Sequence, residues 1–193
     1  MAREADWKIF TNAGPEIGVA STKAFTTQLA ALLILALSIA KSQDKNAEKR
    51  KQATQELRET PGLIDQAFNL KENISQITQN ISTKHNALFL GRGMYFSIAQ
   101  EGALKLKEIS YIHAEAYPAG ELKHGPLALV DEQIPVIALA PEDSLVEKLL
   151  SNLEEVKARG GTLYVFGNAN STMEVKKGKF INPHGDPNCI PMS

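Results

Sequence analysis

The 193-residue sequence predicts an α/β fold in which parallel strands alternate with helices. Short β-prone runs, rich in aliphatic and aromatic residues, occur at 87–90, 134–139 and 162–166. Helical patterns from Tyr95 to Ser110 and from about Ser144 to Arg159 lie between these runs. Strands that are separated in sequence by a helix pair in parallel, so the second half of the chain is expected to form a parallel sheet covered by helices.

The start of the chain is expected to hold a short strand and one long helix. The apolar stretch Trp7 to Phe10 is interpreted as a strand, and Ser21 or Thr22 is expected to cap a helix that runs to about Lys41. Its apolar run from Leu29 to Ala40 is shorter than the roughly 20 residues that cross a bilayer. We therefore interpret this helix as a buried one.

The next segment is charged and is expected to connect two domains. Residues 42–59 are interpreted as a linker helix that Pro61 and Gly62 interrupt. A second helix is expected from Leu63 to Ile81, with one packed apolar stripe. The residues of that stripe are Ile64, Phe68, Ile74, Ile77 and Ile81.

The charge and composition exclude several classes of protein. With 21 basic and 22 acidic side chains, the net charge of -1 offers no general attraction for nucleic acid or for an anionic membrane. Residues 1–20 do not resemble a secretory signal, so a cytoplasmic location is expected. The single cysteine, Cys189, excludes an internal disulfide, and the four histidines are too far apart in sequence for a local metal motif.

Three charged side chains form a stripe on the helix predicted at 95–110. Glu101, Lys105 and Glu108 occur at i, i+4 and i+7, which places them on one face. Apolar residues flank the stripe, so most of this helix is expected to be buried. A carboxylate in such surroundings can act as a proton-transferring base, which makes Glu108 a candidate. The spacing is equally typical of an ion pair on a solvated helix face.

Two loops carry further candidate residues. His124 lies in the glycine-flanked segment 120–126, and its imidazole is suited to proton transfer near neutral pH, although an isolated loop histidine is more often structural. Arg92, between Gly91 and Gly93 in a strand-to-helix turn, offers a guanidinium and backbone amides to an anion. This turn lacks the full dinucleotide or P-loop pattern, and Gly91 is equally explained by the turn itself.

Three segments together resemble the isomerase half of the glucosamine-6-phosphate synthase family. They are EIGVASTK at 16–23, EGALKLKEISY at 101–111 and GELKHGPLAL at 120–129, in the order and spacing of that family. The resemblance extends to about Phe166. It implies a SIS domain at 83–193 with a flavodoxin-like parallel sheet, which we expect to be truncated at its C-terminus. This domain is expected to follow the C-terminal remnant of a first SIS domain at 1–42 and linker helices at 43–82.

The resemblance also implies an activity and roles for named residues. The family converts fructose 6-phosphate and glutamine-derived ammonia to glucosamine 6-phosphate, without a metal or an organic cofactor. By this resemblance Glu108 is the base that moves a proton between C1 and C2, Lys105 tunes its charge, and His124 assists ring opening in the neighbouring subunit of a homodimer. Val19 and Ser21 match a loop that lines the sugar-phosphate site.

The sequence departs from the family pattern in ways that affect activity. The glutaminase domain, the Ser/Thr-rich phosphate loop and the tail with its Schiff-base lysine are not found, so the chain is expected to be inactive alone. A stand-alone sugar-phosphate isomerase or deglycase, and a non-catalytic sugar-phosphate sensor, remain alternatives because one fold can serve all three. The long segments at 101–111 and 120–129 favour the synthase.

Overall fold

The computed structural model describes residues 3–167 and 178–181, and it divides the chain into two compact units. The first unit spans Met1–Gly62 and the second Leu63–Ser193, so the division falls inside the segment expected to link two domains. Each unit is described here by itself.

The first unit is built on the helix α1, Lys23–Ser42, and most of the helix α2, Ala47–Ala67. The carboxylate of Glu16 caps α1, since Oε1 accepts hydrogen bonds from the backbone N–H groups of Thr22 (3.0 Å) and Ala24 (2.9 Å). These groups are among the donors that a helix start leaves without intrahelical partners. Thr22 occupies the cap position, as expected, but its side chain makes no cap hydrogen bond.

Two expectations for the first unit are wrong. Trp7 to Phe10 is not a strand but an exposed stretch, because no neighbouring strand is present among the described residues to pair with it. The apolar helix α1 contains no buried residue. At 20 residues and a mean hydropathy of 1.7, α1 also meets the length and composition of a membrane-crossing helix, a test that core helices of soluble proteins pass too.

The helix α2 continues through Pro61, where the sequence predicted an interruption. Proline removes one intrahelical hydrogen bond, and neighbouring turns can maintain the helix across that gap. The next segment consists of the short 3-10 helix η1, Phe68–Leu70, and α3, Lys71–Ile81, instead of one continuous helix. Of the predicted apolar stripe only Ile77 and Ile81 are buried, whereas Ile64, Phe68 and Ile74 are exposed.

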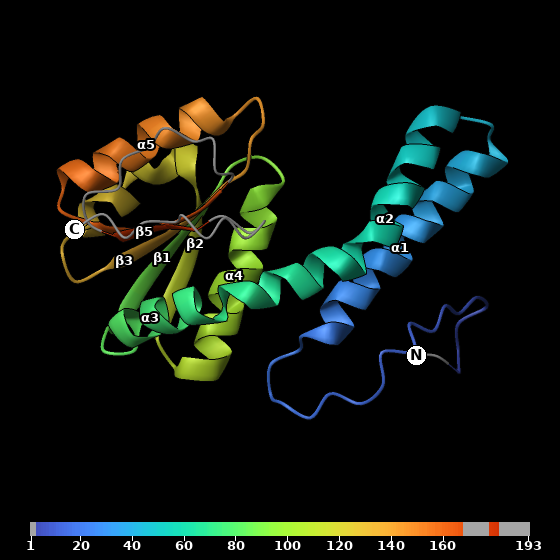
Figure 1. The fold of residues 1–193 in the computed structure, drawn as a ribbon, viewed down its shortest axis with the longest axis horizontal. Coiled ribbons are helices and arrows are strands. Elements are labelled where there is room, and N and C mark those ends of the chain that lie inside the picture. The colour runs from blue at the N-terminus through green and yellow to red at the C-terminus, as the bar shows by residue number, and fades with distance from the viewer. Residues whose placement is uncertain (1–2, 168–177, 182–193) are drawn as a thin grey trace. The chain divides into compact units, whose positions relative to one another are not determined.

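The second unit is an α/β domain with a five-stranded parallel sheet (Figure 1). The spatial order is β2-β1-β3-β4-β5, which is the order of flavodoxin-like folds. The strands are β1 (Asn86–Gly91), β2 (His113–Pro118), β3 (Pro135–Ala140), β4 (Thr162–Gly167) and β5 (Gly178–Ile181). The expected α/β fold with a parallel sheet is therefore confirmed.

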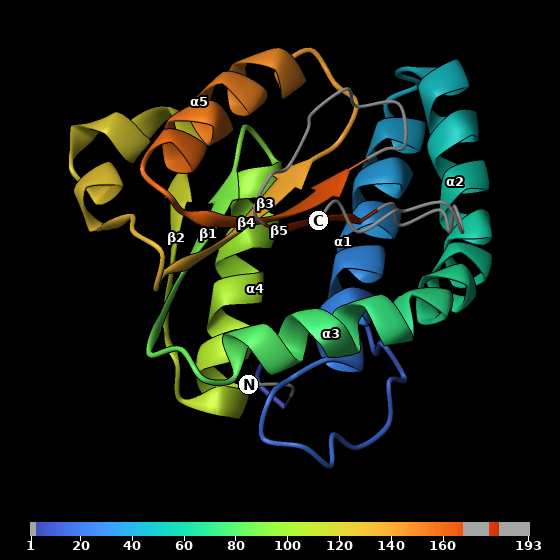
Figure 2. The same ribbon diagram turned by 60° about the vertical axis from the view of Figure 1, so that its left-hand side comes forward.

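Helices cover both faces of this sheet (Figure 2). On one face lie α3 and α4, Tyr95–Ser110. On the other lie α5, Val146–Ala158, and the 3-10 helix η2, Ala119–His124, which is followed by η3, Pro126–Leu129. The sheet therefore separates two layers of helices.

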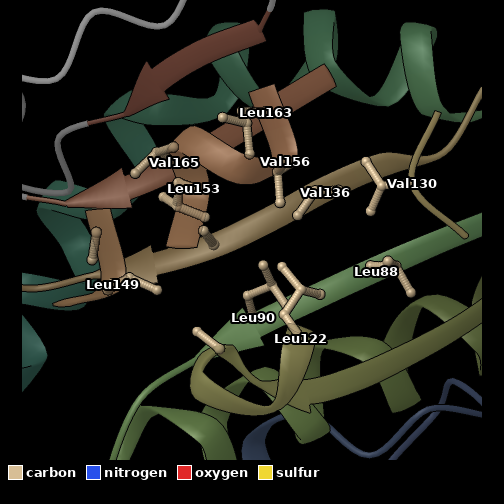
Figure 3. Packing of buried hydrophobic residues seen from close by; sticks show 13 residues of the cluster. Leu88, Leu90, Leu122, Val130, Val136, Leu149, Leu153, Val156, Leu163 and Val165 are labelled. Carbon is tan, nitrogen blue, oxygen red and sulfur yellow. The ribbon is translucent and has the colours of Figure 1, made fainter. Parts of the chain in front are cut away.

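Each face of the sheet has its own hydrophobic core. The core on the α5 side is shown in Figure 3 and unites strand residues such as Leu90 and Val136 with Leu122 of η2 and Leu153 of α5. The core on the α4 side contains Ala103 of α4 together with residues of α3 and the strands. Strands buried on both faces explain the nearly continuous apolar runs from which the sheet was predicted.

The turn between β1 and α4 requires glycine. A Cβ atom on Gly91 would lie 2.3 Å from the backbone oxygen of Tyr95, closer than non-bonded atoms approach. The absence of a side chain therefore lets α4 begin directly over the end of β1, which determines the direction of the helix that carries the charged stripe.

Candidate functional site

The charged stripe on α4 forms a connected set of ion pairs. Lys105 Nζ lies 2.6 Å from Glu108 Oε2 and 3.5 Å from Glu101 Oε1. Their side chains are between 20% and 32% exposed, so this set is partly withdrawn from water although it faces away from the sheet. The hydrogen bond that Lys105 donates to Glu108 is the main reason that the pKa of Lys105 is raised above its ordinary value, with smaller contributions from the charges of both carboxylates. Lys105 is thus a stable ammonium at neutral pH.

The helix around this stripe is less buried than the sequence predicted. Only Ala99 and Ala103 of α4 are buried, whereas Ile98, Leu104 and Ile109 beside the stripe are 45%, 41% and 67% exposed. One side of α4 packs on the sheet, and nothing in the described second unit covers the other side. The charged stripe, itself partly buried, therefore lies beside exposed apolar residues.

His124 ends the 3-10 helix η2 on the opposite face of the sheet. Its Nδ1 lies 2.8 Å from Glu121 Oε2, a partner that the sequence analysis did not identify. Residues at i and i+3 eclipse each other in a 3-10 helix, which brings the two side chains together. Both are largely exposed, so the imidazole is accessible from outside the domain.

Glu108 and His124 do not meet within one copy of the chain. Glu108 belongs to α4, which packs on one core, and His124 belongs to η2, which packs on the other. The sheet lies between the two elements, and a layer of packed helix is about 10 Å thick. Proton transfers that involve both residues cannot occur at one point of a single domain.

Arg92 is turned away from the anion-binding role that the sequence offered. Its Nη1 donates a hydrogen bond to Asn152 Oδ1 of α5, at 2.8 Å, and a longer one to the Lys148 carbonyl, at 3.4 Å. The guanidinium thus connects the β1-to-α4 turn with α5. The crevice beside it, where β1 and β3 end, is filled by side chains such as Leu145 and Leu149.

Val19 and Ser21 lie in the loop that precedes α1, in the first unit. Val19 is 94% exposed, Ser21 is partly exposed, and Ala20 between them is buried. The Glu16 carboxylate closes this loop, because it bonds to backbone groups on the far side of the two residues.

Residues 80–177 match the family model described as the SIS domain. The chain belongs to the SIS domain family. The fold class expected from the sequence is confirmed at this level, and the SIS match covers strands β1 to β4, α4 with its charged stripe, and the η2 segment with His124.

Known relatives confirm the family resemblance. The isomerizing glutamine-fructose-6-phosphate aminotransferase of Acidithiobacillus ferridurans is 57% identical over 184 residues, and that of Pseudomonas aeruginosa is 54% identical over 182. Each match covers 94% of this chain and 30% of the relative, so the chain spans less than a third of their length. The C-terminal domain of the Francisella tularensis enzyme superposes with a TM-score of 0.88 at 50% identity, covering 94% of this chain and 52% of that one.

The SIS domain also has a polar pocket of about 340 Å³ between α4 and the edge strand β2. Gln100, Lys107, Glu115 and Tyr117 contribute to its lining. Tyr117 donates a hydrogen bond to Glu115, which is the main cause of a raised pKa of the tyrosine hydroxyl.

Among the described residues no group of three or more histidine, cysteine or acidic side chains is placed to hold a metal ion.

Proposed function

We propose that this chain is the isomerase part of an enzyme that converts fructose 6-phosphate and glutamine-derived ammonia to glucosamine 6-phosphate. Support comes from relatives that carry the aminotransferase name and are 54% to 57% identical over 94% of the chain. The segments at 101–111 and 120–129, which contain the candidate residues, lie within the SIS match.

The Lys105–Glu108 pair is the observation that carries this proposal. The Glu108 carboxylate takes a proton from C1 of the bound substrate imine and returns it to C2, which is the isomerisation step. The Lys105 ammonium, 2.6 Å away, compensates the negative charge of the carboxylate without competing for the proton, because its pKa is raised. The stripe is 20% to 32% exposed, so a substrate can reach the Glu108 carboxylate from outside the domain.

His124 assists opening of the sugar ring in a neighbouring subunit. Because the sheet separates His124 from Glu108 within one chain, a second copy is needed to bring these two groups to one substrate. The exposed apolar residues beside the stripe on α4 suit such an interface, as an uncovered apolar surface is typical of an interaction site. We therefore infer a homodimer with shared sites.

The first unit carries two further candidate residues. Val19 and Ser21 lie in a loop that the Glu16 carboxylate holds in shape, and we propose that they bind the sugar phosphate. Residues 1–42 then represent the end of a first SIS domain, residues 43–82 a helical linker and residues 83–193 the second SIS domain.

A chimeric enzyme tests the proposed activity. In this chimera the chain replaces the matching stretch of the Pseudomonas aeruginosa aminotransferase, with which it is 54% identical over 182 residues. We expect the chimera to form glucosamine 6-phosphate from fructose 6-phosphate and glutamine in a coupled assay. A folded, dimeric chimera that binds fructose 6-phosphate and turns over none of it would contradict the proposal.

Hybrid dimers test the shared site. Subunits of the chimera with Glu108→Gln and with His124→Ala are each expected to be inactive, and their heterodimer to regain up to half of the activity. One of its two sites then combines an intact Glu108 with an intact His124. Absence of recovery in verified heterodimers would exclude a site shared in this way.

A further inference from the structure

We propose that Arg92 is a positioning residue that holds the His124 segment in its working place. This inference rests on the role proposed above for His124 in ring opening. Arg92, which lies between Gly91 and Gly93, has no part in the proposed proton transfers. Three attachments hold η2, and Arg92 makes the first of them.

The guanidinium of Arg92 is fixed from the side of α5. Its Nη1 lies 2.8 Å from Oδ1 of Asn152, which is buried with 7% of its surface exposed. A buried amide needs a hydrogen-bonding partner, and Arg92 supplies one. The second hydrogen bond, to the carbonyl of Lys148 one turn earlier, orients the guanidinium along α5.

The other side of the same guanidinium lies against η2. A Cβ atom on Gly120 would lie 3.3 Å from Nη2 and 3.6 Å from Cζ of Arg92, so the guanidinium lies close enough to the Gly120 backbone to crowd a side chain at that position. Arg92 therefore acts as a spacer between α5 and the first turn of η2. Gly120 fits this contact because it has no side chain.

Two further attachments hold the remainder of η2. Leu122 is 1% exposed and packs in the core with residues of α5. Lys123 Nζ pairs with Glu155 Oε1 of α5 at 2.7 Å. Arg92 fixes the start of η2, Leu122 its middle and Lys123 its end, and His124 follows directly. A shift of Gly120 is thus transmitted to the imidazole through one short, rigid segment.

Lysine cannot replace arginine in this arrangement. The guanidinium is planar and presents several N–H groups in a fixed geometry, so one part can bond α5 while its face supports Gly120. A lysine ammonium can bond Asn152 but offers no flat surface to η2. Arg92→Lys should therefore retain the buried hydrogen bond and lose the spacer.

Amide hydrogen exchange in the 193-residue chain tests whether Arg92 holds η2 in place. In Arg92→Met we expect amides of 119–124 to exchange at least tenfold faster, with those of α4 unchanged, and in Arg92→Lys an intermediate increase. Asn152→Leu, which removes the acceptor on α5, should increase exchange in the same segment. Arg159→Met is the matched control, since Arg159 is exposed. Unchanged exchange at 119–124 in folded Arg92→Met and Asn152→Leu would overturn the proposal.

Complementation in the chimera tests whether the anchoring acts through His124. An Arg92→Met subunit should regain activity when paired with Glu108→Gln, because the site at its own Glu108 receives His124 from the partner. It should not regain activity with His124→Ala. The reverse pattern would place Arg92 with the Glu108 site and overturn the proposal. If the reference pair, Glu108→Gln with His124→Ala, regains no activity, the shared site is contradicted. Amide exchange of residues 119–124 would then be the measurement that decides whether Arg92 holds η2 in place.

Discussion

At the scale of single residues, the central feature is an ammonium held between two carboxylates. Lys105 is closer to Glu108, at 2.6 Å, than to Glu101, at 3.5 Å, so these partners are not equivalent. A lysine whose pKa is raised does not give up its proton near neutrality. Among the three, the proposed proton-transfer role therefore suits a carboxylate, and Glu108 has the tighter contact with the charge that can stabilise it.

Replacing Glu108 with glutamine should separate binding from proton transfer. The amide preserves the size of the side chain but cannot accept a proton, and loss of a general base typically costs about 10² to 10⁴ in rate. In the chimera we expect Glu108→Gln to bind fructose 6-phosphate normally and to lose most exchange of the C1 hydrogen with solvent, followed by NMR. Exchange at the unmodified rate would end the assignment of Glu108 as base.

Replacing Lys105 should have a smaller effect on the same exchange. Lys105→Met keeps the length of the side chain and removes the charge beside Glu108, so it changes the base without removing it. The exchange rate should lie between those of the unmodified chimera and Glu108→Gln. The matched control is Lys107→Met, which changes an exposed lysine on another side of α4. Equal effects of both lysine changes would argue against a specific role for Lys105.

At the scale of elements, the start of α1 is joined to its preceding loop by one carboxylate. Hydrogen bonds from the backbone N–H groups of Ala24 and Thr22 hold the pKa of Glu16 below its ordinary value of 4.5. A lowered pKa means that the ionised form is favoured in the folded chain. The stabilising contribution is thus complete above about pH 4.5 and is lost as the pH falls through the lower, folded value.

The cap predicts a local dependence on pH. Amide exchange at Thr22 and Ala24 should accelerate below pH 4.5 relative to amides in the middle of α1. Glu16→Gln should remove this pH dependence, because the glutamine oxygen accepts the same hydrogen bonds without titrating. Glu4→Gln serves as a control for an acidic residue earlier in the chain. Persistence of the full pH effect in Glu16→Gln would assign it to another group.

At the scale of the whole molecule, one copy of the chain does not bring the residues of the proposed site together. Glu108 and His124 lie on opposite sides of the sheet, and both are reached by water. Water weakens electrostatic stabilisation in an open site. Residues that are far apart also cannot hold one substrate in the geometry that the reaction requires. These losses affect every step that the proposed function requires.

The isolated chain should therefore have no measurable synthase or isomerase activity. The coupled assay for glucosamine 6-phosphate, with ammonia and fructose 6-phosphate supplied to soluble chain, provides the measurement, and the chimera is its positive control. Turnover within tenfold of the chimera would show that the essential residues have been misplaced.

The isolated chain should also self-associate through α1. Leu32 and Ile39 are 61% and 50% exposed on this apolar helix, and burying such a surface between copies is favourable. Sedimentation velocity over a range of concentrations should show association that Leu32→Gln with Ile39→Gln reduces. Phe68→Gln changes an equally exposed apolar residue outside α1 and should leave association unaltered. A concentration-independent monomer would contradict this expectation.

Local patterns in the sequence were sufficient for most elements of the SIS domain. The apolar runs of β1, β3 and β4, and the helical periods of α4 and α5, are strong because each element is buried on one or both faces. The strand β2 was missed. Its sequence, HAEAYP, combines two alanines with a terminal proline, and at the edge of the sheet it needs no continuous apolar run.

The sequence by itself determined which residues are candidates, since helical spacing aligns Glu101, Lys105 and Glu108 and a short segment supplies His124, and the resemblance implied their roles. Only the tertiary structure decided how these groups are related. Because α4 and η2 pack on opposite faces of the sheet, Glu108 is separated from His124. Because α5 packs beside the turn after β1, Arg92 donates its hydrogen bond to Asn152 and is not left for an anion. Periodicity describes which residues share a face of one element, whereas the partners of that face depend on contacts between residues far apart in the chain.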